Sequence, residues 1–559
     1  MRVNRQMKSR AAAPAKTPPA VAAPAPRQTS ALEHLVGSLP TVLLAQTALL
    51  TLVGWKYRYA LNSDAIAYLR IASYYADGKF ALAISGYWGP LLSWLMVPLI
   101  RLGVDPVGAA RVVMGLSALL FTAGCREVFR AFELPESARR FGVWLAAGLS
   151  LYWSVENITP DLLAGGSVAL ACSRMLTPGW LERRRDAIFA GLFWGIAFWA
   201  KAVAFFLAIG VVAGVAGLWI LVHRRSAARE VLRSLGLTLL VFGVLAGAWI
   251  GVISRKYQQL TISTSARLNH AMVGPPDRER PYPFGWNFQA PEPGRVTVWE
   301  DPSTLTYPDW SPWSSWAYAR HQMSVIAGNL STVSLLLTGI CLAFPALLIL
   351  AGWRWLQPGW RRDQFTQRWW WSVVPLVVLS ALYLPGNLLA SEQRYFYPTF
   401  PFLYVFAAGI WWSTPNATRS PQQNWLGLGL LTASFVLPAI ARPSLAPGST
   451  RAAGEFGRQL ADKLIAAGIR GPIAGSGMVD GGRAGLYAAY YLGEPWLGDE
   501  RPATVEGYQN SHAKLIIVNR RQNVARDLDQ NLTFRSLDQR LFDSPEEASR
   551  FPLKVYQAF

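Results

Sequence analysis

Long apolar segments separated by short arginine-rich loops constrain this chain more than any other feature of its sequence. A helix needs about 20 residues to cross the hydrocarbon of a bilayer, so an apolar segment of roughly that length predicts a membrane span. Roughly eleven such segments are present, with boundaries uncertain by about 3 residues. They lie at 39–55, 109–128, 141–156, 160–176, 187–200, 202–222, 234–254, 328–352, 370–389, 395–413 and 424–441.

The composition agrees with a membrane protein. The chain of 559 residues is 52% hydrophobic and only 15% charged, whereas soluble domains carry about 25% charged residues. The three cysteines lie in or beside apolar segments without metal-ligand or redox spacing, so we expect no disulfide framework. The predicted fold class is an α-helical polytopic membrane protein with a small α/β domain at its C-terminus.

The arginines predict how the chain is oriented. If the helices alternate in direction, four arginine-rich loops fall on the same side as the basic N-terminal tail; they lie at 126–140, 183–185, 224–233 and 354–368. Short cytoplasmic loops carry an excess of Lys and Arg, so this side is predicted to be cytoplasmic. Lys56, Arg58, Arg255 and Lys256 fall on the other side and run mildly against this pattern. The net charge of +20 thus sets orientation, and without a basic module interleaved with aromatic residues we expect no nucleic-acid partner.

One stretch decides the number of spans. Residues 188–222 could form one long tilted helix or two short ones, but both flanks are rich in arginine. Two cytoplasmic flanks require a hairpin, and the turn of that hairpin is predicted to lie near Lys201.

The spans divide the chain into three predicted regions. Residues 1–34 are rich in Ala, Pro and basic residues and lack an apolar signal segment, so they predict a disordered cytoplasmic tail. Residues 35–441 form the membrane domain, with large outside loops at 56–105 and 255–322. Residues 442–559 predict an outside α/β domain with buried strands near 471–477 and 513–519 and a helix near 485–491. Gly475, Gly477 and Gly481 suggest a phosphate-binding loop, but their spacing is imperfect and an outside domain meets no nucleotide.

The first outside loop contains the strongest candidate for a catalytic residue. Asp64 begins a stretch with an apolar helix face that is too short to span the membrane, so we expect a helix lying along the interface. A second apolar stretch at 86–99 is interrupted by Pro90 and Pro98 and also suits a surface helix. The local sequence alone favours a helix cap as the role of Asp64.

This order of segments and motifs resembles the GT-C class of membrane glycosyltransferases, which includes protein O-mannosyltransferases and lipid A aminoarabinose transferases. In that class an Asp in the first outside loop, at the start of a surface helix, is the catalytic carboxylate, and Asp64 matches it. Tyr68 and the segment Tyr87-Trp88-Gly-Pro-Leu-Leu-Ser-Trp resemble the elements that follow. The resemblance covers roughly residues 35–440 apart from the long second outside loop.

Three further motifs carry the same resemblance. The class has an acidic residue outside, before the fourth span, and Asp161 in Ile-Thr-Pro-Asp-Leu-Leu supplies one, with Glu156 beside it. Lys201 matches a basic residue at a hairpin turn that meets the lipid phosphate. Arg394 and Tyr395, in Glu-Gln-Arg-Tyr-Phe-Tyr-Pro, resemble the Arg-Tyr-x-x-Pro entry to a late span.

The resemblance implies transfer of a monosaccharide from a polyprenyl-phosphate donor to a lipid, protein or glycan acceptor at the non-cytoplasmic membrane face. Such a donor carries an anionic phosphodiester, and fixed positive charge in a poorly hydrated site stabilises that leaving group. Lys201 and Arg394 are the candidates for this charge, although Lys201 could snorkel to the interface and Arg394 could pair with Glu392 or lipid headgroups. Asp64 is the candidate general base.

Other residues have less defined candidate roles. Asp161 or Glu156 would orient the acceptor or hold a divalent cation, the only cofactor considered. The aromatic-rich second outside loop could stack sugars, line a lipid groove or simply sit at the membrane interface. His270 is the candidate among the five histidines because it lies in the loop over this site, and none of the five has metal-ligand spacing.

Two other classes of function remain. A transporter or flippase of a lipid-linked saccharide would often show internal hydropathy repeats, and we find none that is convincing. A non-catalytic scaffold would leave Asp64, Asp161, Lys201 and Arg394 unexplained. We therefore expect a multi-pass enzyme of a bacterial inner membrane, in contact with membrane lipids, whose site faces the periplasm or exterior.

Overall fold

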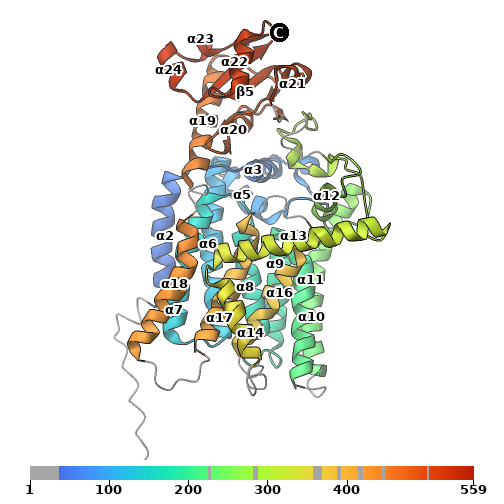
Figure 1. Cartoon of the computed structure of the whole chain (residues 1–559), viewed down its shortest axis with the longest axis vertical. Helices are drawn as coiled ribbons and strands as arrows, with labels where there is room; N and C mark the ends of the chain where they lie inside the picture. The colour runs from blue at the N-terminus through green and yellow to red at the C-terminus, as the bar shows by residue number, and fades with distance from the viewer. Residues whose placement is uncertain are drawn as a thin grey trace, which may run out of the picture.

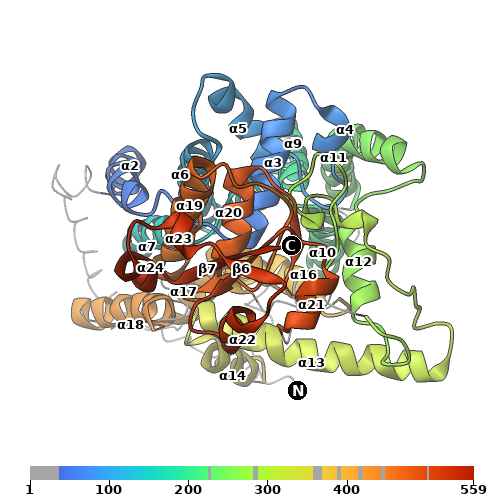
Figure 2. The same cartoon turned by 90° about the horizontal axis from the view of Figure 1, so that it is seen from above.

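The computed structural model describes residues 37–223, 228–280, 288–356, 368–386, 392–412, 420–441, 447–499 and 503–559. The predicted tail at 1–34 lies outside the described residues. A bundle of roughly parallel helices forms one end of the molecule and an α/β domain forms the other (Figure 1). Seen from above, the α/β domain lies over the bundle (Figure 2).

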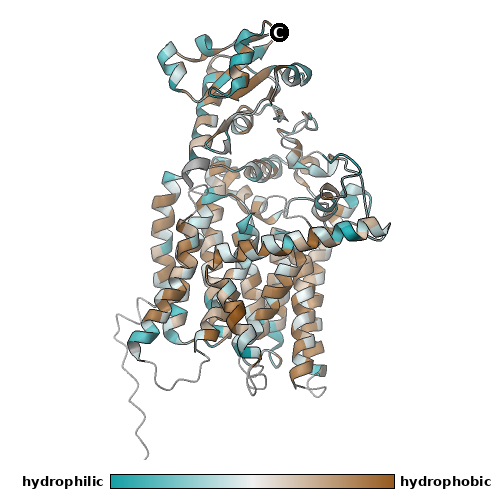
Figure 3. Ribbon diagram, viewed as in Figure 1, coloured by the Kyte–Doolittle hydropathy of each residue, from teal (hydrophilic) through white to brown (hydrophobic). Residues whose placement is uncertain are grey.

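Among the described residues, six helices are long and apolar enough to cross a membrane. They are α2 (Leu39–Lys56), α6 (Pro106–Ala131), α10 (Val203–His223), α11 (Ala228–Tyr257), α13 (Trp316–Ile340) and α18 (Pro421–Ile440). The bundle is completed by α7 (Glu136–Glu156), α8 (Asp161–Leu176), α9 (Arg184–Ala200), α14 (Phe344–Trp355), η4 (Arg368–Ser372), α16 (Val373–Leu382) and α17 (Phe400–Trp412). Hydrophobic residues predominate along the bundle, and polar ones are concentrated at its ends and in the α/β domain (Figure 3). The chain is an integral membrane protein.

Helix α8 lies at the centre of the bundle, packed against α6 and α9 and buried along nearly its whole length. Its sequence, Asp-Leu-Leu-Ala-Gly-Gly-Ser-Val-Ala-Leu-Ala-Cys-Ser, is rich in small residues. Small residues allow helix backbones to approach closely where lipid provides no hydrophobic driving force between helices. Asp161 begins α8, so this packing fixes the position of its carboxylate.

The predicted hairpin at Lys201 is confirmed, because α9 ends at Ala200 and α10 begins at Val203. The predicted span at 328–352 is wrong. There the chain forms α13 and α14, with Cys341 after the end of α13 and a proline in the first turn of α14. Leu342 donates its backbone N–H to Ser434 O at 2.7 Å instead of continuing the helix. Helix α13 lies across the bundle (Figure 1), so the number of membrane crossings stays a prediction.

Three helices of the first outside loop lie above the bundle: α3 (Ser63–Ala76), α4 (Phe80–Ala83) and α5 (Leu91–Arg101). Helix α3 buries its apolar face, with Ala65, Ile66 and Leu69 excluded from solvent. The prediction that Asp64 lies at the head of a helix is confirmed, since it is in the first turn of α3.

The predicted C-terminal α/β region is confirmed. Helix α19 (Pro447–Ala466) leads from the bundle to a five-stranded sheet of order β4-β1-β5-β7-β6. Strands β1 (Ile473–Ala474), β4 (Trp496–Gly498) and β5 (Leu515–Asn519) are parallel, and β7 (Leu553–Ala558) is antiparallel to β5 and to β6 (Phe534–Ser536). The other elements are β2 (Met478–Val479), β3 (Gly482–Arg483), α20 (Ala484–Leu492), α21 (Val505–Asn510), α22 (Asn523–Gln530), α23 (Asp538–Leu541) and α24 (Pro545–Arg550).

The glycine-rich turn after β1 is used for packing the sheet. Gly475 N–H donates to Gly498 O at 3.1 Å, and Gly477 N–H donates to Ile517 O at 3.1 Å. Since these amides are already bonded within the sheet, they do not form a phosphate cradle.

The second outside loop joins the bundle to the sheet. Trp496 N–H of β4 donates to Val296 O, and Gln289 N–H donates to Leu497 O, both at 2.7 Å. The loop therefore contacts the edge strand β4 of the sheet. It also contains α12 (Ser265–Met272), η2 (Val298–Glu300) and η3 (Pro302–Thr304).

Helix α19 approaches the first outside loop closely enough to require glycine. A Cβ atom on Gly454 would lie 1.8 Å from the backbone oxygen of Tyr59. We expect Gly454→Ala to lower the free energy of unfolding by about 1–3 kcal/mol, because the two backbones must separate. The melting midpoint of the purified chain in detergent measures this. Gly328→Ala is the control, since a Cβ there meets nothing within 4 Å; equal midpoints for the two variants would contradict the prediction.

Candidate functional site

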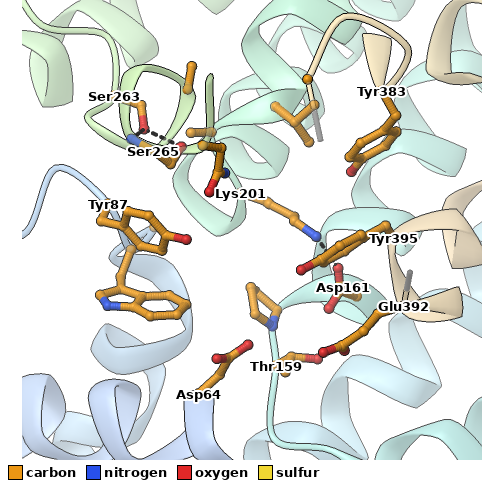
Figure 4. A pocket seen from close by; sticks show the side chains of 18 of the residues that line it. Asp64, Tyr87, Thr159, Asp161, Lys201, Ser263, Ser265, Tyr383, Glu392 and Tyr395 are labelled. Atoms are coloured by element: carbon orange, nitrogen blue, oxygen red, sulfur yellow. Dashed lines mark hydrogen bonds and ion pairs between the residues drawn. The ribbon is translucent and has the colours of Figure 1, made fainter. Parts of the chain in front are cut away.

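A cavity of about 610 Å³ lies where the upper end of the bundle meets the outside loops. Its volume is in the range of about 300–1,000 Å³ typical of small-molecule sites. It brings together nine of the ten residues that the sequence singles out: Asp64, Tyr68, Tyr87, Trp88, Asp161, Lys201, His270, Arg394 and Tyr395. Figure 4 shows the carboxyl groups of Asp64, Asp161 and Glu392 directed toward the same space.

Asp64 points into the cavity rather than capping its helix. The N-cap of α3 is Asn62, whose side-chain oxygen accepts the backbone N–H of Ile158 at 2.9 Å. The carboxylate of Asp64 accepts a hydrogen bond from Arg394 Nη2 at 2.5 Å on one oxygen and from Trp299 Nε1 at 3.2 Å on the other. The alternative that Asp64 is only a helix cap is therefore wrong.

Lys201 also faces the cavity rather than the membrane surface. Its ammonium group forms an ion pair with Asp161, the first residue of α8, and lies 4.1 Å from the ring centroid of Tyr395. Burial lowers the pKa of Lys201, and the negative charge of Asp161 opposes this fall. The hairpin turn thus places one cation against one carboxylate and one aromatic face.

Arg394 lies in η5 (Gln393–Thr399) with its side chain only 6% exposed. It forms ion pairs with Asp64 and Glu392, so both the expected pairing with Glu392 and a contact with the candidate base are present. Burial raises the pKa of Glu392, and the Arg394 guanidinium opposes the rise. The cavity wall thus contains three carboxylates and two cations. Lys201 pairs with Asp161, and Arg394 pairs with both Asp64 and Glu392.

Aromatic rings line one side of the cavity. Tyr87 and Trp88 lie 5.2 and 6.0 Å from Trp299 between ring centroids, and Trp88 Nε1 donates to Trp299 O at 2.7 Å. Tyr68 lies 5.0 Å from Trp88. Burial, and after it the charges of Asp161 and Asp64, raises the pKa of Tyr68, so its phenol remains a neutral hydrogen-bond donor. Tyr383 and Tyr395 are stacked 5.8 Å apart, at an interplanar angle of 10°.

Trp299 is held in place by its neighbour Glu300, which is fully buried. Glu300 accepts hydrogen bonds from the backbone N–H groups of Val296 and Thr297 at 2.7 and 3.1 Å, and from Tyr74 Oη of α3 at 2.7 Å. Burial raises the pKa of Glu300, while the Tyr74 hydrogen bond and the Arg70 guanidinium oppose the rise. Asp301 anchors the same segment to the end of α11 by an ion pair with Lys256 at 2.7 Å.

Two predicted residues have less direct positions. His270 is on the cavity wall but stacks on Trp310 at 4.3 Å and lies 3.3 Å from Gln322 Oε1. Glu156 does not line the cavity: it is buried at the end of α7, and Tyr397 Oη donates to it at 3.4 Å. Within the described part of the chain, no group of three His, Cys, Asp or Glu residues is placed to hold a metal ion.

The cavity is also lined by residues that were not predicted as part of the site, among them Trp299, Tyr383 and Glu392. Trp299 comes from the long second outside loop, where no periodic pattern identifies one tryptophan among several. Glu392 could have been predicted as part of the site, because it lies two residues before Arg394.

The fold is similar to that of known structures. No protein-family model matches the chain, and no curated protein matches its sequence. The structure of ArnT from Cupriavidus metallidurans bound to undecaprenyl phosphate matches with a TM-score of 0.52 and 15% identity, over 92% of this chain and 97% of that chain. The apo structure of the same protein matches with a TM-score of 0.51 and 15% identity, over 93% and 98%. The GT-C-like fold implied by the sequence motifs is thus confirmed.

The anchoring of Trp299 can be tested through stability. Glu300→Ala would leave the backbone amides of Val296 and Thr297 without their acceptor and Arg70 without its carboxylate neighbour, while Tyr74 would keep only Gly294 O as an acceptor. We expect a loss of about 3–5 kcal/mol in the free energy of unfolding, as for a broken buried ion pair. Glu292→Ala is the control, since Glu292 is exposed and pairs with Arg295 at 2.9 Å. A melting midpoint of Glu300→Ala equal to that of Glu292→Ala would contradict this account.

Proposed function

We propose that the chain is a glycosyltransferase that moves a monosaccharide from a polyprenyl-phosphate donor to a lipid, protein or glycan acceptor. The observation that carries the proposal is the cavity itself, where a carboxylate in the first turn of α3 faces two cations at the ends of membrane helices. Ionisable groups at membrane depth are costly and are retained where they have a function.

Asp64 is the proposed general base. It takes the proton from an acceptor hydroxyl or amine as that atom attacks the anomeric carbon of the sugar. The bond between the anomeric carbon and the phosphate oxygen breaks, its electron pair leaves with the polyprenyl phosphate, and the anomeric configuration is inverted. The hydrogen bonds from Arg394 and Trp299 fix the direction of the Asp64 carboxylate.

Lys201 and Arg394 are the proposed partners of the donor phosphate. Negative charge grows on the phosphate as the sugar leaves, and cations already fixed by Asp161 and Glu392 meet that charge without rearranging. In this scheme Asp161 positions Lys201, while Glu156 lies behind the cavity wall. The rings of Tyr87, Trp88 and Trp299 supply faces against which a sugar can stack.

The likeness to ArnT supports a lipid-linked donor, because the matched ArnT structure holds undecaprenyl phosphate. The two arginine-rich turns within the described residues, between α6 and α7 and between α8 and α9, lie at the end of the bundle away from the cavity, which supports a site facing the outside of a bacterial inner membrane.

Transfer in proteoliposomes tests the proposal. The purified chain is supplied with polyprenyl-phosphate sugars and candidate acceptors, and free polyprenyl phosphate is measured. We expect release by the wild type and a loss of about 10²–10⁴-fold in kcat for Asp64→Asn, because the base is removed. Asp309→Asn is the control, since Asp309 is exposed and forms an ion pair with the equally exposed Arg267 at 2.6 Å.

Normal turnover by Asp64→Asn at normal expression would overturn the role of Asp64. Passage of an intact sugar-lipid across the bilayer, insensitive to Asp64→Asn, would instead identify a transporter of the lipid-linked saccharide.

Trp299 allows a finer test of the same scheme. Trp299→Phe keeps an aromatic ring in the wall but removes the N–H that bonds to Asp64. A hydrogen bond to a charged group contributes about 1.5–3 kcal/mol, so we expect kcat to fall roughly 10- to 100-fold with little change in the KM for the donor. Trp313→Phe, at a fully exposed tryptophan of the same loop, should leave kcat unchanged. A change confined to KM would show that Trp299 only stacks on substrate.

A further inference from the structure

A second cavity, of about 180 Å³, lies at the opposite end of the bundle from the first. Its walls come from the start of α2, the last turns of α6 and the first turn of α7, all at the foot of the bundle in Figure 1. The charged residues that line it are Arg126, Glu136, Arg139 and Arg140. None of them takes part in the site described above.

Positive charge is in excess around this cavity. Glu136 is the single carboxylate in its wall, and it is shared by Arg139 and Arg140. Arg126 pairs with Glu127 at 2.8 Å outside the wall, and Glu127 also lies near Arg130 and Arg174. Arg174 also pairs with Asp186 at 3.9 Å, so Arg126, Arg130, Arg139 and Arg140 share two glutamates, which leaves the cavity electropositive.

The backbone adds to this positive potential. Ser38 caps α2, so the positive end of that 18-residue helix dipole is directed at the cavity. A Cβ atom on Gly37 would lie 2.6 Å from Arg140 Nε. The glycine thus lets the guanidinium lie directly against the start of α2. Arginine forks and a helix N-terminus are both groups that bind phosphate.

The surroundings of the cavity favour a lipid over a free ion. Helices α2 and α7 pack side by side, joined by a hydrogen bond from Gln46 Nε2 to Ser150 Oγ at 2.9 Å. One turn further into the bundle, Leu44 of α2 is 71% exposed and Trp144 of α7 is 37% exposed. Apolar side chains are therefore available to acyl chains just beyond the charged cavity, at the depth where headgroup gives way to hydrocarbon.

We propose that this cavity binds the phosphate of an anionic phospholipid headgroup, with the acyl chains lying along α2 and α7. Basic pockets between membrane helices on the positively charged side of a protein suit such headgroups. The site lies at the membrane face opposite the candidate active site and does not depend on the proposed function of that site.

Native mass spectrometry of the full chain in detergent tests the proposal, with phosphatidylglycerol and phosphatidylcholine as probes. We expect the wild type to retain one phosphatidylglycerol in preference to phosphatidylcholine. The double variant Arg139→Gln/Arg140→Gln should bind phosphatidylglycerol at least about tenfold more weakly, because two charge-assisted contacts are lost. Arg184→Gln/Arg185→Gln is the matched control: it removes two arginine charges at exposed positions outside the cavity wall.

A second variant guards against misfolding of the first. Gly37→Ala removes no charge but displaces Arg140 from the start of α2, and it should also weaken phosphatidylglycerol binding. Melting midpoints without lipid report on the fold of each variant. Equal binding of phosphatidylglycerol by the wild type and both folded variants would overturn the proposal, as would equal binding of phosphatidylcholine. Stabilisation by inorganic phosphate equal to that by phosphatidylglycerol would overturn the assignment to a lipid and indicate a site for the free ion.

Discussion

The ion pair between Asp64 and Arg394 joins residues 330 positions apart, and the candidate site is built around it. Asp64 lies in α3, which follows the first membrane helix α2, and Arg394 lies in η5, directly before α17. Taking two charges out of water is expensive unless further hydrogen bonds satisfy them. Glu392 on one side and Trp299 on the other supply those contacts. Helix α8 packs against η5, so the Arg394 side of the pair is 6% exposed while the Asp64 side is 21% exposed.

The second outside loop and the C-terminal domain hold in place the groups that contact this ion pair. Glu300 holds the segment that carries Trp299 by bonding to its own backbone and to Tyr74 of α3. The same segment is bonded to β4 through Val296 and Trp496. The C-terminal domain is therefore connected to the candidate base by a short series of backbone and side-chain hydrogen bonds. These hydrogen bonds are a physical reason for the C-terminal domain to stay fixed over the cavity, since it is then attached through more than α19 alone.

The sequence predicts those features that depend on one-dimensional patterns. Apolar length and arginine placement locate most of the bundle helices and the hairpin at Lys201, because hydrocarbon thickness and loop charge act on each segment separately. The break after Ile340 was missed because the apolar run continues through the proline of α14. Trp299 was missed because its loop has no period and its partner Asp64 lies 235 residues away. Glu156 and Asp161 were not distinguished, although the chain reverses between them and only Asp161 reaches the cavity.

The two charged cavities lie at opposite ends of the bundle and differ in how their charge is balanced. At the cavity around Asp64 each cation is matched by a carboxylate, and Glu392 adds a third acid. At the second cavity Arg139 and Arg140 share one wall carboxylate, Glu136. On the proposed functions this difference is physically reasonable. A catalytic site that held the phosphate of donor and product tightly would lower KM without raising kcat. Cations that are already paired with carboxylates bind the phosphodiester of the bound donor weakly. They stabilise the additional negative charge that develops on the phosphate as the sugar leaves. A bound lipid undergoes no reaction and need not be released, so its site can keep an unbalanced positive charge.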